Sequence, residues 1–251
     1  MQKFVLLADR RSGTTLVIDC LNSVESIQCE KRAFGIDKKV ENPDKNHHSG
    51  LFFLYRSETL SRKFKFWISR QSLIRDFLDE RIFCTEEAQS ILGFRLIYNK
   101  ADQHPEILDS LRNSETKIIH LVRENVFKTH ISYLTAPMHK MHHPREGDQI
   151  KTVKLHLDAG TLLADLRKRN SRIEKRRNSL AGFDVLEVTY ESFVKDRDGE
   201  AARIQPFLGL DEVVPFQTDL VKINPDSLAD IIENYDEITN LLSGTEFEKF
   251  L

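Results

Sequence analysis

The 251-residue sequence is poor in the features that mark membrane, nucleic-acid-binding and multidomain proteins. No apolar run approaches the ~20 residues that a helix needs to cross a bilayer. The net charge is only −2, with acidic and basic residues interspersed, which gives no support for nucleic-acid binding. No repeat, low-complexity tract or Pro/Gly/Ser-rich linker interrupts the chain. We therefore predict a single domain over residues 1–251, without a membrane span.

Cysteine is also scarce. Cys20, Cys29 and Cys84 are odd in number and form no CxxC pair, a usage typical of free thiols in a reducing compartment. The apolar run at residues 4–8 is too short for a signal peptide, and no cleavage pattern follows it. These observations predict a cytoplasmic protein.

Short apolar runs alternate with longer helical patterns along the chain, which predicts a parallel sheet covered by helices. With right-handed crossovers the sheet is doubly wound. The expected fold is therefore an α/β three-layer sandwich, with a mainly parallel central sheet and helices on both faces, related to the P-loop nucleotide kinases. Residues 31–69 are expected to hold loops and one short helix, and residues 225–242 a helix. The predicted strands span residues 3–8, 25–29, 94–98, 117–122 and 184–189.

The strongest functional signal is the loop DRRSGTTL that follows the first strand. A strand, a turn with Gly13 and a helix start form an anion site, because the first-turn N–H groups and the helix dipole face the ligand. Arg11 adds a planar donor fork that suits phosphate or sulfate oxygens. Three hydroxyl donors lie beside it: Ser12, Thr14 and Thr15. The alternative is an ordinary strand-to-helix turn capped by Ser12 or Thr14.

This loop differs from a Walker A motif, GxxxxGK[ST], at two positions. Ala8 and Thr14 stand where the motif has its first glycine and its lysine. The lysine that reaches a γ-phosphate is therefore missing, and no apolar strand clearly ends in an aspartate suited to magnesium. The loop can bind a shorter 5′-anion, whereas ATP or GTP hydrolysis is disfavoured.

A second motif lies at the end of the strand at residues 117–122. Arg123 follows this strand at the edge where ligands of open α/β sheets bind. Ser132 lies nine residues further on, about two and a half helical turns away in the next helix. An arginine and a serine form a reasonable pair for a phosphate monoester. The alternative is that Arg123 pairs with Glu124 or another acid at the surface.

These motifs resemble the sulfotransferase family that uses 3′-phosphoadenosine 5′-phosphosulfate (PAPS). The loop from Arg11 to Leu16 is similar to the family's 5′-phosphosulfate loop. The pair Arg123 and Ser132 is similar to its 3′-phosphate site, with the nine-residue spacing of a bacterial branch related to the Nod-factor and glycolipid sulfotransferases. Three further segments resemble the same branch, at residues 93–98, 190–193 and 222–251.

The resemblance implies PAPS as the donor, adenosine 3′,5′-bisphosphate (PAP) as the product and no required metal. It implies that Arg11 contacts the bridging and leaving-group oxygens. It places Tyr190 near the adenine and makes Lys222 a candidate 3′-phosphate contact. The backbone cradle is implied for the rest of the loop: Ser12, Gly13, Thr14 and Thr15.

The acceptor side departs from the family pattern. The family often has a glutamate as general base just after the second strand, but Arg32 stands there and Glu30 lies two residues earlier. Glu30 could act as the base, a histidine such as His142 could replace it, or the acceptor could need little deprotonation. An arginine there could also pair with an anionic acceptor group. Histidines of this kind can equally lie in a surface loop or bind a metal: His47, His48, His139, His142 and His143.

The resulting hypothesis is PAPS-dependent sulfation of a hydroxyl or amine on a small molecule. Candidate acceptors are a carbohydrate, a glycolipid or a specialised natural product such as a polyketide or guanidinium alkaloid. One alternative is a catalytically inactive nucleotide-binding module, which Arg32 keeps open. Another is a small-molecule or nucleotide kinase, which the missing lysine opposes. A homo-oligomer stays open. The basic residues between 167 and 177 are expected on the solvated face of a long helix.

Overall fold

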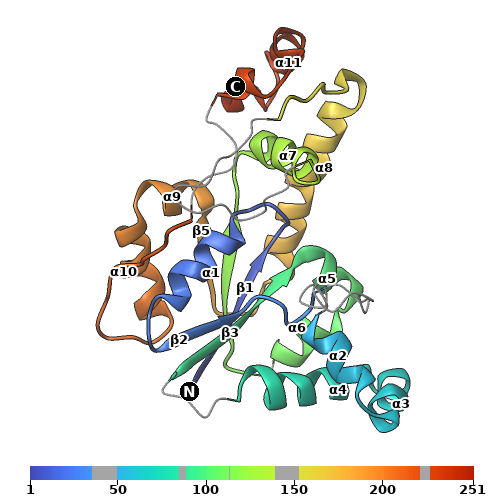
Figure 1. Ribbon diagram of the computed structural model, residues 1–251, viewed down its shortest axis with the longest axis vertical. Helices are drawn as coiled ribbons and strands as arrows, with labels where there is room; N and C mark the ends of the chain where they lie inside the picture. The colour runs from blue at the N-terminus through green and yellow to red at the C-terminus, as the bar shows by residue number, and fades with distance from the viewer. Residues whose placement is uncertain (36–49, 85–88, 113, 139–152, 221–226) are drawn as a thin grey trace. The chain divides into compact units, whose positions relative to one another are not determined.

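The computed structural model describes residues 1–35, 50–84, 89–112, 114–138, 153–220 and 227–251 (Figure 1). The chain forms two compact units. The first, called here the sheet unit, contains residues 1–122 and 180–217. The second, called the helical unit, contains residues 123–179 and 218–251. The single domain over residues 1–251 stays a prediction.

Five parallel strands form the centre of the sheet unit, in the order β2-β3-β1-β4-β5. This order confirms the predicted doubly wound α/β sheet. Strand β1 is apolar without interruption because helices cover both of its faces, and its residues Phe4 to Ala8 are fully buried. The strands are β1 (Gln2–Ala8), β2 (Ile27–Glu30), β3 (Ile91–Ile97), β4 (Lys117–Val122) and β5 (Val185–Thr189).

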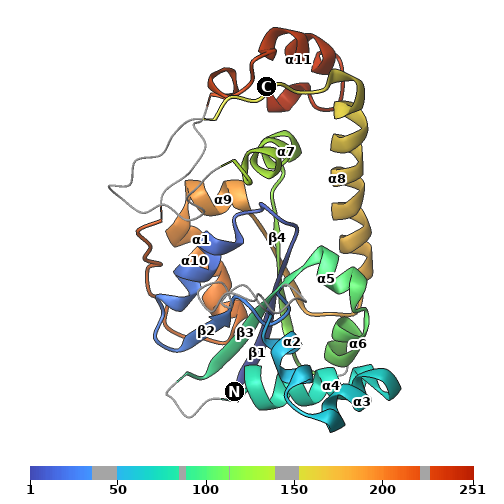
Figure 2. The same ribbon diagram turned by 45° about the vertical axis from the view of Figure 1, so that its right-hand side comes forward.

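One face of the sheet packs against α1 (Thr14–Asn22), α9 (Tyr190–Lys195) and α10 (Arg197–Phe207), as Figures 1 and 2 show. The core on this face requires Gly93 in β3. A Cβ atom there would lie 2.4 Å from the Phe4 ring, far inside van der Waals contact. Gly93 thus lets the Phe4 ring lie directly over the neighbouring strand.

The other face carries α2 (Leu51–Ser57), α4 (Arg70–Phe77), α5 (Tyr98–Gln103) and α6 (Glu106–Arg112). Its core is an aromatic cluster in which Phe34 lies 5.2–5.6 Å from the rings of Phe52, Phe77 and Phe94. The prediction of loops and one short helix for residues 31–69 is wrong, because α2 and α3 (Leu60–Ile68) occupy much of that range. In α3 no residue is buried, so its apolar residues do not follow a core-facing pattern.

The helical unit contains α7 (Val126–Thr135), α8 (Ala159–Ser179) and α11 (Tyr235–Leu242). The continuous helix expected at residues 225–242 is wrong: a single 3₁₀ turn, η3 (Leu228–Asp230), is followed by a bridge between Leu155 and Ile232. The Asn234 side chain exchanges two hydrogen bonds with the Leu157 backbone, at 2.9 and 3.0 Å, immediately before α11 begins. These contacts tie the turn before α11 to the Leu155–Leu157 segment and interrupt the helix.

The basic run of α8 is only partly solvated, which corrects the prediction of a solvated face. Arg176 is 8% exposed. Arg169 donates from Nε to His130 Nδ1 of α7 at 3.3 Å and lies over the Tyr133 ring. Arg167 pairs with Glu246 at 2.9 Å on the surface. Within the helical unit, Arg169 of α8 therefore contacts α7, and Arg167 contacts the segment after α11. No helix in the described ranges of either unit is long and apolar enough to cross a membrane.

Candidate functional site

The loop after β1 has an unusual backbone. Arg11 has φ 67°, and among the described residues it is the one non-glycine residue with a positive φ. A side chain in this left-handed region costs about 1–2 kcal/mol. Gly13 adopts φ 85° and is the N-cap residue of α1. Turns of this kind direct successive N–H groups into a concave nest that binds anions. A conformation this costly for arginine is typical of a functional loop.

The start of α1 is suited to an anion. Its first turn contains no acidic residue, and the N-cap residue has no side chain that could accept a hydrogen bond from the first-turn amides. The alternative of a turn capped by Ser12 or Thr14 is therefore wrong, because Gly13 holds the cap position. Ser12 and Thr14 are 3% and 8% exposed, so both residues are largely shielded from solvent. The helix dipole at this end favours a negative ligand.

Tyr190 lies against this loop. A Cβ atom added at Gly13 would be 2.3 Å from Tyr190 Cδ2 and 2.5 Å from Cε2, so the ring occupies the space a side chain would need. Tyr190 is the first residue of α9, directly after β5, and the Thr189 side chain caps this helix by accepting from the Ser192 amide at 3.0 Å. The structure thus brings together two motifs that lie 177 residues apart.

The sheet order puts this loop at the edge where such folds bind ligands. Strands β1 and β4 are neighbours, with Ala8 paired to Leu121, and the winding of the sheet reverses between them. In open α/β sheets the crevice outside the carboxyl ends of the strands at such a reversal is the usual ligand site. The Arg11 loop begins at the carboxyl end of β1.

Glu30, the last residue of β2, lies at a different level along the strand direction from the end of β1. It pairs with Phe94, which in turn pairs with Val5, so Glu30 is level with a residue three positions before the end of β1. Strand geometry puts it about 10 Å back along the strand direction and about 10 Å across from β1. Its Oε1 accepts the Arg32 amide hydrogen at 2.6 Å. The structure therefore does not bring the Glu30 backbone to the Arg11 loop.

Arg95 is a charged residue that the sequence reasoning did not single out. It lies in β3 beside Leu6 of β1, and burial lowers the pKa of its guanidinium, with Cys29 and Glu30 acting in the opposite direction. The signal in the sequence was a single arginine inside an apolar strand. Cys29 itself is a free, buried thiol whose pKa is raised by burial.

A buried hydrogen-bonded chain crosses the sheet unit and was also missed. The Tyr98 hydroxyl lies 2.6 Å from His120 Nε2, and His120 Nδ1 lies 3.0 Å from a Glu187 carboxylate oxygen. Because a carboxylate only accepts, Nδ1 carries a hydrogen, and in the neutral ring Nε2 accepts from Tyr98. Tyr98 and His120 are each 1% exposed. In the sequence, the only local indication of this chain was a histidine within an apolar strand.

Arg123 and Ser132 belong to the helical unit. Arg123 is half-buried, and Ser132 is a buried residue of α7. Asn125 begins this helix as its N-cap and accepts the Lys128 amide hydrogen at 2.7 Å. The roles of Arg123 and Ser132 at a phosphate stay predictions.

Two predicted site residues, Lys222 and His142, lie outside the described residues. So do the other histidines considered at the acceptor side, His47, His48, His139 and His143. Within the described part of the chain, no three or more His, Cys, Asp or Glu side chains gather as a metal site.

An all-parallel, doubly wound sheet whose first strand ends in a turn suited to an anion is an architecture typical of nucleotide-binding α/β proteins. The sequence profile of the Sulfotransferase family matches residues 4–214, and the chain belongs to this family. It is therefore a sulfotransferase.

Solved structures similar to this chain include a sulfotransferase from Alicyclobacillus acidocaldarius, at 13% identity and TM-score 0.48, covering 90% of this chain and 87% of that one. A mouse sulfotransferase complexed with PAP matches at 14% identity and TM-score 0.47, covering 84% and 59%. The sulfotransferase domain of the Synechococcus PCC 7002 olefin synthase matches at 22% identity and TM-score 0.46, covering 84% and 74%. No curated protein matches the chain.

Proposed function

We propose that this sulfotransferase moves a sulfuryl group from PAPS to a hydroxyl or amine of a small-molecule acceptor, a carbohydrate, glycolipid or specialised natural product. One observation carries the proposal. The Arg11 loop combines a left-handed arginine, a left-handed glycine at the helix N-cap and the Tyr190 ring against that glycine. This arrangement suits a 5′-anion attached to an aromatic base, with the anion at the helix start and the base beside the tyrosine.

The residues of the loop have distinct roles in the proposed transfer. Sulfuryl transfer needs an in-line nucleophile and stabilisation of the negative charge that grows on the departing phosphate, as phosphoryl transfer does. We assign the stabilisation of that charge to Arg11 and to the N–H groups of the α1 first turn. Ser12, Gly13, Thr14 and Thr15 provide the cradle around the 5′-phosphosulfate. Arg123, Ser132 and Lys222 are assigned to the 3′-phosphate by the resemblance alone.

The general base is proposed to be either Glu30 or His142. The register of β2 and the hydrogen bond from the Arg32 amide favour His142 over Glu30. In both cases the base accepts the proton of the acceptor hydroxyl or amine as its oxygen or nitrogen attacks sulfur, and the S–O bond to the phosphate breaks.

A thermal-shift experiment with PAP, 5′-AMP and ATP tests the donor assignment. A ligand at a hundred times its Kd stabilises the folded state by about 2.7 kcal/mol, which gives a clear rise in Tm. We expect PAP to raise Tm more than 5′-AMP, and ATP to have little effect. A rise with ATP alone would support a kinase instead and contradict the proposal.

The transfer step is then measured with PAPS and a panel of hydroxyl and amine acceptors, by the release of PAP. Arg11→Ala should lower kcat by about 10²–10³, the usual loss when one donor to developing charge is removed. Arg10→Ala is the matched control, because Arg10 is its exposed neighbour in the same loop. PAP binding without transfer to any acceptor in the panel would favour the inactive nucleotide-binding module.

A further inference from the structure

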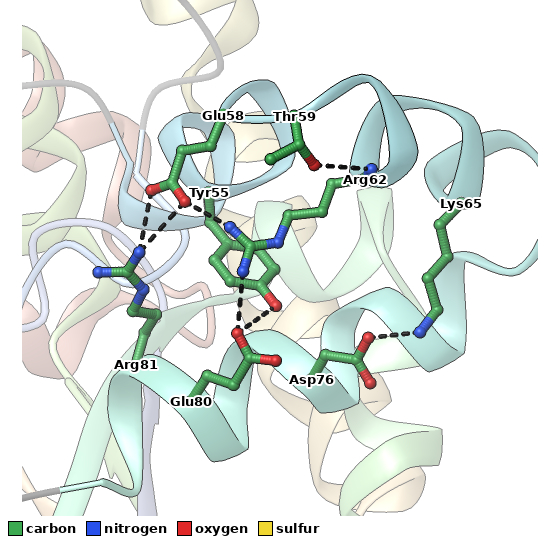
Figure 3. A network of polar contacts seen from close by, with 8 residues as sticks. All are labelled: Tyr55, Glu58, Thr59, Arg62, Lys65, Asp76, Glu80 and Arg81. Atoms are coloured by element: carbon green, nitrogen blue, oxygen red, sulfur yellow. Dashed lines mark hydrogen bonds and ion pairs between the residues drawn. The ribbon is translucent and has the colours of Figure 1, made fainter.

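Helix α3 is attached to the sheet unit through its polar face. Arg62 donates to Glu80 at 3.0 Å and pairs with Glu58, while Lys65 pairs with Asp76 of α4 (Figure 3). The Arg62 guanidinium also lies 3.7 Å from the centre of the Tyr55 ring. Ion pairs and cation–π contacts, rather than apolar burial, therefore fix this helix in place.

The partly buried Phe66 completes the attachment. Its ring lies 6.3 Å from that of Phe52, and the guanidinium groups of Arg56 and Arg70 lie 4.5 and 4.7 Å from its centre. The Thr59 side chain caps the helix by accepting the Arg62 amide hydrogen at 3.1 Å. These contacts hold α3 from one side, which sets the direction in which its other side points.

That other side is apolar. Leu60, Phe64, Trp67 and Ile68 follow the spacing i, i+4, i+7 and i+8, which at about 100° per residue is a stripe roughly 100° wide. The stripe is centred roughly 160° away from the inward-facing Arg62, Lys65 and Phe66. Leu60 and Trp67 are 82% exposed, and Phe64 and Ile68 are 68% exposed. The helix has the reverse of the usual orientation, with its apolar side directed away from the core.

In Figures 1 and 2, α3 lies at the periphery of the sheet unit, beside α2 and α4. A contiguous apolar patch of this kind on a folded protein marks an interaction surface. The apolar patch does not contribute to the core of the sheet unit, because none of the nine residues of α3 is buried.

Charge identifies the class of partner. Residues 51–70 contain five Lys and Arg residues and one acidic residue, a local charge of +4 in a chain whose net charge is −2. Arg62, Lys65 and Arg70 are held in ion pairs. Lys63 is exposed at the edge of the stripe and forms no ion pair within the described ranges, whereas Arg56 lies over Phe66 on the attached side of the helix. The apolar stripe thus has one exposed cation, Lys63, at its edge.

A stripe of Trp, Phe, Leu and Ile on a helix whose polar face is basic, through Arg62, Lys63 and Lys65, is the composition of helices that lie in a membrane interface. The residues at 36–49 are a poor alternative occupant, since Ile36 and Val40 are their only large apolar side chains. We propose that α3 is an interfacial docking helix, which places the protein on an anionic phospholipid bilayer with Trp67 and Phe64 at the boundary between headgroups and acyl chains. The proposal does not depend on the reaction that the Arg11 loop catalyses.

Trp67 is the only tryptophan of the chain, so intrinsic tryptophan fluorescence reports on this helix alone. The full-length protein is titrated with vesicles of equimolar phosphatidylcholine and phosphatidylglycerol, and with vesicles of phosphatidylcholine. We expect a blue shift of the emission and sedimentation of the protein with the anionic vesicles, both weakened by salt because surface charges are screened. Neutral vesicles should bind it at least about tenfold more weakly.

Two variants test the residues. Phe64→Ser removes apolar surface from the stripe, and Lys63→Glu reverses the charge at its edge. Both substitutions alter exposed side chains and leave Trp67 in place. Each should weaken binding to the anionic vesicles about tenfold. Val213→Ser is the matched control, because Val213 is an exposed apolar residue in the loop after α10, at 43%. It should bind as the unaltered protein does.

Three results would overturn the proposal. The first is unchanged emission with anionic vesicles. The second is a blue-shifted emission in buffer that depends on protein concentration, since a second copy of the chain would then cover the stripe. The third is a blue-shifted emission that is independent of concentration, which would mean that another part of the same chain covers it.

Discussion

Replacing Gly13 with alanine adds one methyl group between the Arg11 loop and the Tyr190 ring. Two separate costs are expected. Gly13 has φ 85°, a left-handed conformation that costs an alanine about 1–2 kcal/mol. The new Cβ would also lie 2.3 Å from Tyr190 Cδ2, so the ring has to move by about 1 Å to reach normal contact. Overpacking of this kind typically costs about 1–3 kcal/mol.

Gly209→Ala is the matched control for the first cost. Gly209 has φ 91°, and a Cβ atom there has nothing within 4 Å. Its substitution should cost only the ~1–2 kcal/mol of the backbone conformation. We therefore expect Gly13→Ala to lower the free energy of unfolding by about 1–3 kcal/mol more than Gly209→Ala, measured by urea denaturation. In a Tyr190→Ala background this difference should disappear, because the ring that the methyl group displaces is absent.

The same two variants also test whether the Arg11 loop binds PAP. Isothermal titration of PAP should show at least about a tenfold loss of affinity in Gly13→Ala and unchanged affinity in Gly209→Ala. Equal destabilisation by the two substitutions would refute the contact between Gly13 and Tyr190. Destabilisation without any loss of PAP affinity would refute the assignment of the loop to the donor.

Three further outcomes are expected. Burial first, and then the charge of Arg169, lower the pKa of His130, so the unfolded chain binds a proton that the folded chain does not. Stability should therefore fall as the pH falls below about 6.5, the ordinary pKa of histidine, and His130→Gln should show a smaller fall in urea titrations at pH 5 and 7.5. His120→Phe should lower the free energy of unfolding by about 1–3 kcal/mol, because a buried hydrogen-bonded chain loses its centre, whereas Glu187→Gln should cost less since that side chain is 36% exposed. Glu30→Gln should retain kcat within about tenfold, and a loss of 10²–10⁴ with unchanged PAP affinity would identify Glu30 as the base.

The loop after β1 could be predicted from the sequence because its signals are local. The buried strand β1, the glycine that follows it and the start of α1 lie within 13 consecutive residues, from Gln2 to Thr14. The contact between Gly13 and Tyr190, in contrast, could not be predicted from local signals. It depends on β5 and α9 folding onto the same sheet edge as β1, and no spacing within either segment specifies it.

Features that depend on long-range packing could not be predicted in this way. A histidine inside the apolar strand β4 does not reveal that Tyr98 and Glu187 lie on either side of its ring. Helix α3 could not be predicted from the sequence for a related reason. Periodicity identifies a helix by the side it buries, and α3 is held by ion pairs with Glu80 and Asp76 while its apolar stripe faces outward.

The register of the sheet bears on the acceptor side, where the sequence departs from the family pattern. Strand β2 ends at the level of Val5, so a base on this strand starts about 10 Å short of the end of β1 in the strand direction. Glu30 also accepts the Arg32 amide hydrogen, and this hydrogen bond occupies one of the acceptor sites of its carboxylate. A base from a segment beyond the strand ends does not have this constraint. If Glu30→Gln retains kcat and His142→Gln loses it, the general base lies in the segment after α7 and not on the sheet. An arginine at position 32 would then be compatible with catalysis, because no base would be needed there.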